Sequence, residues 1–94
     1  MNPNYTIWNG IPLFPAMITG EEGVVGDYQF TTKASAAEIV AFYESEMPKL
    51  GWELSEDMMA SEEEPVFVKE GTFAFFKVSP EEDHNIVWIH TFKP

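Results

Sequence analysis

Residues 35–52 constrain the fold most, because they satisfy the rules for a complete α-helix in one stretch. Ser35 followed by Glu38 is a capping box, in which each side chain bonds the other residue's unpaired backbone N–H. Gly51 stands where a left-handed glycine ends a helix, and Pro48 should loosen the last turn. Apolar side chains recur at steps of three and four residues: Ile39, Val40, Tyr43, Met47 and Leu50. We expect one helix of about 15 residues with its apolar stripe facing a core.

Stretches with the composition and alternation of β-strands surround this helix. Two precede it and four follow it, at residues 16–22, 27–33, 52–59, 65–69, 72–79 and 84–92. An acidic turn is expected at residues 61–65. The order ββαββββ predicts an α+β fold, with a mainly antiparallel sheet of about six strands and one helix on one of its faces.

The chain is long enough for one domain. Its 94 residues are 45% hydrophobic and include eight Phe and three Trp, so one core can offset the entropy of ordering them. Residues 1–15 carry large apolar side chains among three prolines, which predicts an apolar N-terminal arm rather than a helix or a central strand. We expect residues 16–94 to form the single α+β domain.

A pattern within the chain resembles a known family. Ile11-Pro12-Leu13-Phe14-Pro15-Ala16, Phe42-Tyr43 and Gly51-Trp52 are similar to the IPxFPxA … FY … GW pattern of small bacterial α+β domains of unknown function. The match covers roughly residues 11–54, and Met17-Ile18 and the acidic turn depart from it. The resemblance implies a fold, and it carries over no catalytic residue because the pattern consists of structural positions.

Charge excludes several classes of partner. The net charge is −11, with sixteen acidic residues against five Lys and no Arg. Nucleic-acid backbones and anionic membrane surfaces are bound through Lys and Arg, so we expect neither as a partner. No run approaches the ~18 apolar residues of a membrane span, and Met1-Asn2-Pro3 does not open a signal peptide. The compartment stays unknown, since a mature exported fragment would look the same.

The last three strands carry apolar side chains on both sides, which a one-layer sheet does not need. We expect a three-residue loop at Lys69-Glu70-Gly71, so that Val66, Val68, Ala74, Phe76 and Val78 face the helix. The far side then carries a candidate partner or ligand face: Phe67, Phe73, Phe75, Trp88 and His90. Four large aromatic rings of about 150–250 Å² each would expose about 600–1,000 Å², more than the usual largest patch of a monomer.

Three alternatives remain for what buries this face. The N-terminal arm could fold over it, a second copy of the chain could make an isologous dimer, or an apolar ligand or another protein could bind there. A different class of function would place a small apolar-ligand carrier or enzyme pocket between helix and sheet, lined by Tyr43, Met47 and Trp88.

The residues for catalysis and metal binding are sparse. His84 and His90 lie about 20 Å apart if both are in one strand, too far to share a metal ion. There is no cysteine, and no glycine-rich phosphate loop or nucleophile motif. We therefore predict no catalytic residue, no metal and no cofactor. A non-enzymatic interaction or self-association domain is favoured, with a homo-oligomer or another protein as the partner.

Overall fold

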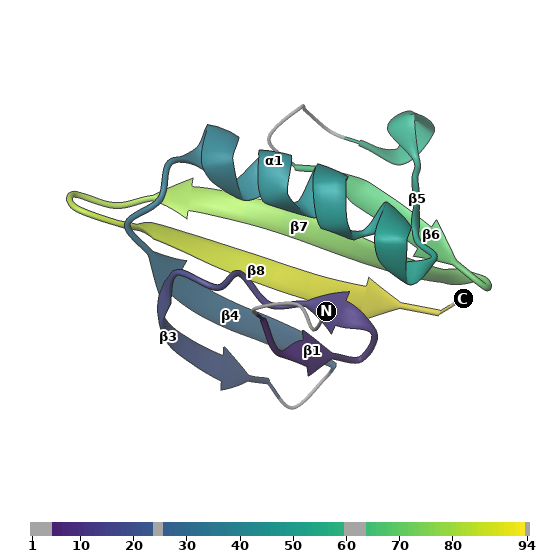
Figure 1. Ribbon diagram of the computed structural model, residues 1–94, viewed down its shortest axis with the longest axis horizontal. Coiled ribbons are helices and arrows are strands. Elements are labelled where there is room, and N and C mark those ends of the chain that lie inside the picture. Colours follow the sequence, from purple (N-terminus) through teal and green to yellow (C-terminus); the bar gives the residue numbers. More distant parts are fainter. Residues whose placement is uncertain (1–4, 24–25, 60–63, 94) are drawn as a thin grey trace.

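The computed structural model describes residues 5–23, 26–59 and 64–93, and within them one α-helix lies beside a six-stranded antiparallel sheet (Figure 1). The strand order across the sheet is β3 (Met17–Glu22), β4 (Asp27–Thr32), β8 (Asn85–Phe92), β7 (Thr72–Pro80), β6 (Val66–Lys69) and β5 (Glu53–Leu54). The predicted α+β class, with one helix and about six strands, is confirmed. A second, two-stranded sheet of β1 (Ile7–Trp8) and β2 (Ile11–Pro12) was not predicted.

The helix α1 (Ala36–Glu46) begins at the predicted cap. The Ser35 Oγ accepts the Glu38 backbone N–H at 3.1 Å, and the Ser35 backbone N–H donates to the Glu38 carboxylate at 3.2 Å. The helix is shorter than expected because proline at position 48 supplies no N–H, and the chain continues as the 3₁₀ turn η1 (Pro48–Leu50). Gly51, with φ of +94°, ends that turn in the left-handed region as predicted. The most buried residues of the predicted stripe are Ile39, Tyr43 and Met47.

The N-terminal arm packs on the same side of the sheet as the helix. The ring of Phe14 stacks on that of Phe30 in β4 with ring centroids 6.2 Å apart. The ring centroids of Trp8 and Tyr28 lie 5.5 Å apart. Trp52 Nε1, just after η1, donates to the Gly10 carbonyl at 2.9 Å. Residues 5–15 of the arm therefore help to build the core, and of the three alternatives left open for the far side of the sheet, cover by the arm is wrong for these residues.

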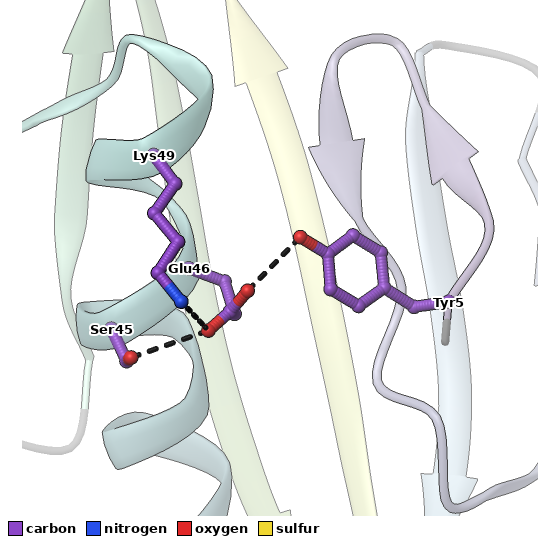
Figure 2. A network of polar contacts seen from close by, with 4 residues as sticks. All are labelled: Tyr5, Ser45, Glu46 and Lys49. Atoms are coloured by element: carbon purple, nitrogen blue, oxygen red, sulfur yellow. Dashed lines mark hydrogen bonds and ion pairs between the residues drawn. The ribbon is translucent and has the colours of Figure 1, made fainter. Parts of the chain in front are cut away.

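A polar network ties the arm to the end of the helix (Figure 2). Tyr5 Oη donates to Glu46 Oε1 at 3.0 Å, and Lys49 Nζ and Ser45 Oγ both donate to Glu46 Oε2. Hydrogen bonding to Lys49 is the main cause of the lowered pKa of Glu46. Lys49 also compensates for a carboxylate near a helix C-terminus, where the macrodipole disfavours negative charge.

The turn between β6 and β7 has two residues, not three. Lys69 pairs with Thr72, which leaves Glu70 and Gly71 as the loop, with φ of +50° and +79°. Two successive left-handed residues are typical of the type I′ turn, whose twist matches that of the strands it joins. The predicted three-residue loop is therefore wrong, and so is the register that placed Phe67 on the same side as Phe73, because Phe67 pairs with Ala74.

The strand predicted at residues 52–59 is also mostly absent. Only β5 pairs with β6, and the chain then turns through the 3₁₀ segment η2 (Glu56–Met58). Trp52 is buried against the arm, so it does not take part in the alternation that suggested a longer strand. The acidic turn expected at residues 61–65 lies largely outside the described residues.

One continuous core lies between the sheet and the layer formed by α1 and the arm. Its sheet side consists of inward side chains from four strands: Phe30, Phe67, Ala74, Phe76, Val87 and Ile89. Tyr43 of α1 contacts this layer through Phe76, with ring centroids 4.4 Å apart. The inner side of β4, β8, β7 and β6 is thus occupied.

The two-residue turn makes a testable prediction. Gly71→Ala should lower the free energy of unfolding by about 1 kcal/mol, because a Cβ at Gly71 meets no atom within 4 Å and the cost is backbone strain alone. Glu70→Asn should raise it by a few tenths to about 1 kcal/mol, since Asn tolerates positive φ better than Glu. Urea denaturation measures both. A three-residue loop with only Gly71 left-handed would leave Glu70→Asn neutral.

Candidate docking face

The side of the sheet away from α1 carries apolar side chains over β6, β7 and β8. Alternation along the strands turns Phe75 outward, and its cross-strand neighbours Val66 and His90 point the same way. Phe73 and Trp88 also point outward. We call this surface the aromatic face and define it by its outward residues: Val66, Val68, Phe73, Phe75, Lys77, Ile86, Trp88, His90 and Phe92.

Four of the five predicted site residues lie on this face. They are Phe73, Phe75, Trp88 and His90. The fifth, Phe67, is a correction: it has no exposed surface and points into the core, where its ring meets that of Phe76 edge-on at 5.7 Å. The cause is the two-residue turn, which shifts the β6 register by one position against the expectation and so exchanges its two sides.

The same shift brings out residues that the sequence reasoning missed. Val66 and Val68 were assigned to the helix side and instead pair with Phe75 and Phe73 on the aromatic face. Phe92, at the end of β8, pairs with Phe73 and is 50% exposed. The available signal for Val66 and Val68 was Glu70-Gly71 read as a two-residue turn. For Phe92 it was the alternation of β8, which continues from Trp88 and His90.

The rings on the aromatic face partly shield one another. Phe73 and Phe75 lie with ring centroids 6.3 Å apart, and Trp88 Nε1 donates to the Gln29 side chain of β4 at 3.0 Å. All three aromatic side chains are half-buried. The exposed apolar area is therefore smaller than the sum of whole rings that the sequence suggested.

The aromatic face differs from the rest of the surface in charge. None of the sixteen acidic residues of the chain lies in β6, β7 or β8, and the charged or titratable outward groups are Lys77 and His90, both exposed. Of the net charge of −11, the face contributes +1 through Lys77, and carboxylates flank it in β4 and β5, where Asp27 pairs with His90 and Glu53 with Val68. Close approach of a second acidic molecule costs least where carboxylates are fewest, as over these three strands.

A shallow hollow of about 300 Å³ interrupts the aromatic face. Its lining is mostly apolar with a cation and a carboxylate at the rim: Met58, Glu64, Val66, Phe75, Phe76, Lys77, Trp88 and His90. Of its lining residues, Val66 is only 3% exposed, whereas Met58 of η2 is 47% exposed. The hollow is thus an opening at the surface.

The space between helix and sheet is filled. Tyr43 and Met47 have no exposed surface, and Trp88 lies on the opposite side of the sheet, so these three residues do not line a common pocket. Burial raises the pKa of Tyr43, which keeps its phenol protonated, and the adjacent Phe14 backbone offsets a little of that rise. Among the described residues the Tyr43 hydroxyl has no aligned hydrogen-bond partner.

Other titratable groups are dispersed. His84 Nδ1 lies 2.7 Å from Asp83 Oδ1 in the exposed turn before β8, and this contact lowers the pKa of Asp83. Within the described ranges no three His, Asp or Glu side chains gather as metal ligands would. No helix among those residues is long and apolar enough to cross a membrane.

Comparison with known proteins finds one family. The model of a family described as START domain-like matches residues 16–75, more than half of the chain. The chain belongs to the START domain-like family. No curated protein and no solved structure matches it.

The START domain-like match covers only part of the aromatic face. It runs from the start of β3 through α1 to Phe75 in the middle of β7. The arm lies before it, and Trp88, His90 and Phe92 lie after it. Membership of the START domain-like family therefore describes the fold and assigns no role to the residues of β8.

The opposite placement of two phenylalanines can be tested. Phe67→Ala should lower the free energy of unfolding by about 3–5 kcal/mol, because it opens a cavity in the closed core. Phe75→Ala should lower it by less than half as much, because its ring is half-buried at the surface. Urea denaturation compares the two. Equal losses would contradict the observed register.

Proposed function

We propose that this START domain-like chain is a non-enzymatic interaction domain that self-associates, with the aromatic faces of two copies packed against each other. The observation that carries the proposal is an apolar outward face whose strands β6, β7 and β8 contain no carboxylate, on a chain of net charge −11. The inner side of the sheet is already filled by α1 and the arm, so the aromatic face is the side of the sheet open to a partner.

Electrostatics favours this face over other surfaces for contact between two copies. Two chains of the same sign repel each other, and the repulsion is greatest where carboxylates face carboxylates at short range. Opposing the acid-free strands β6, β7 and β8 keeps the acidic turns at the periphery, where water and salt screen them.

The shape of the aromatic face also favours a second copy of the chain as its partner. Two sheets pack face to face when their inner side chains interdigitate, and an isologous interface uses one surface twice. The face offers half-buried rings beside small outward residues such as Val68. Because its rings are half-buried, the face offers less area than whole rings would, and we expect a weak dimer with a dissociation constant between about 1 μM and 1 mM.

The alternative, a carrier or enzyme with a pocket between helix and sheet, has less support. The side chains that would line such a pocket enclose one another, and Tyr43, Met47, Phe67 and Ile89 have no exposed surface. A ligand there would need the helix to move away from the sheet.

We also infer that the IPxFPxA … FY … GW pattern marks structural positions of a fold. Ile11, Phe14 and Trp52 are all buried in the core, and Trp52 bonds the arm through Gly10. Tyr43 of the FY pair is enclosed between α1 and the sheet. These contacts support a role in joining arm, helix and sheet rather than in chemistry.

Analytical ultracentrifugation over a concentration series up to roughly millimolar tests the proposal. Wild type should show reversible dimerisation. Trp88→Lys and Phe75→Lys should each weaken it at least about a hundredfold, because a charge would be buried in the interface without a partner. Ile18→Lys is the matched control, since it makes the same charge change at a 56% exposed residue on the edge strand β3.

The two results that would refute self-association are distinct. Wild type that stays monomeric at the highest concentration removes it. So does a dimer that Trp88→Lys, Phe75→Lys and Ile18→Lys weaken equally, because the contact would then lie elsewhere. Near-ultraviolet circular dichroism confirms that each variant keeps the native packing.

A further inference from the structure

The aromatic face carries a projection as well as the hollow. Phe92 is 50% exposed and is the most exposed of the aromatic residues, all of which lie in the described parts of the chain. It pairs across the sheet with Phe73, whose ring lies 6.3 Å from that of Phe75, and Phe75 lines the hollow. The projection and the hollow are therefore successive features along the same two strands.

The hollow is large enough for an aromatic ring. A cavity of about 150 Å³ with apolar walls accommodates benzene, and the hollow on this face is about 300 Å³. Its walls are the aromatic and aliphatic side chains Phe75, Trp88, Val66 and Met58. Lys77 at the rim could place its ammonium group over an inserted ring, a cation–π contact that favours an aromatic occupant over an aliphatic one.

The spacing between Phe92 and the hollow suits a two-fold axis between two copies. Phe92 and Trp88 are four residues apart in β8, or about 13 Å along the strand. An axis between the two sheets that crosses the strands midway, near His90, exchanges the two ends of this segment. Each Phe92 is then brought opposite Trp88, which lines the hollow of the other copy, as an isologous contact allows.

We propose that the Phe92 side chain of each copy inserts into the hollow of the other, between Trp88 and Met58, and so sets the register of the dimer. This inference rests on the proposed self-association and specifies its partner surface. The second copy is favoured as the occupant because the projection and the cavity that fits it lie on one face, so the surface complements itself.

Two measurements on the wild-type dimer test it. Phe92→Ala should raise the dissociation constant about tenfold or more, as removal of a central aromatic anchor does, and Phe92→Leu should fall between it and wild type. Ile18→Ala is the control, because it truncates an equally exposed apolar residue away from the face. In a mixture of labelled and unlabelled chains, isotope-filtered nuclear Overhauser spectra should show contacts between the Met58 methyl of one copy and the Phe92 ring of the other.

The outcomes separate this inference from the proposed function. Dimerisation with no contact between Met58 and Phe92 of different copies overturns the insertion, whatever Phe92→Ala does, and leaves self-association standing. Dimerisation that Phe92→Ala and Ile18→Ala affect equally also overturns it. A wild type that stays monomeric overturns both.

Discussion

The pairing of Lys69 with Thr72 across a two-residue turn decides which side chains of this molecule meet the core. Because side chains alternate along a strand, a shift by one position exchanges the two sides of β6 completely. With the observed register, Phe67 and Ala74 lie under the helix and Val66 and Val68 lie on the outside. The filled core and the aromatic face are two consequences of that one turn.

The two sides of the single sheet differ: the inner side faces the core and the outer side faces solvent. Its inner side is covered jointly by α1 and the N-terminal arm (Figure 1). The two are joined through the Tyr5–Glu46 hydrogen bond (Figure 2) and through that of Trp52 with Gly10. Because the arm is used on this side, it leaves the outward rings of β7 and β8 uncovered by residues 5–15. A chain that places its acidic residues outside these strands keeps that surface available for an apolar contact.

The features that interactions between neighbouring residues determine were predicted from the sequence. The capping box at Ser35 and Glu38 and the left-handed Gly51 are set by nearest neighbours, and both were visible in the sequence. The 3₁₀ turn at Pro48 shortened the helix as proline chemistry requires, although the sequence reasoning extended it. Strand character was found at all six sheet strands, because alternation is a local signal, although β5 covers only two of the residues predicted at 52–59.

The features that the sequence did not predict depend on contacts between residues that are far apart in the chain. The placement of Phe67 depended on whether Glu70 adopts a positive φ. The twist of the paired strands favours that conformation, but a glutamate does not indicate it in the sequence. The role of the arm depended on Trp52 and Phe30, which are far from it in sequence. Phe92 follows Trp88 and His90 on one side of β8, and its pairing with the distant Phe73 places it beside the rings of β7.

The three tryptophan indoles provide the most direct test of the aromatic face as the contact between copies. Trp8 and Trp52 donate their indole N–H to Glu22 and Gly10 on the inner side, whereas Trp88 donates to Gln29 on the outer side. In a dilution series followed by nitrogen–proton correlation spectra, the Trp88 indole signal should move with concentration while those of Trp8 and Trp52 stay in place. A Trp88 signal that does not move, or three signals that move together, would contradict the account.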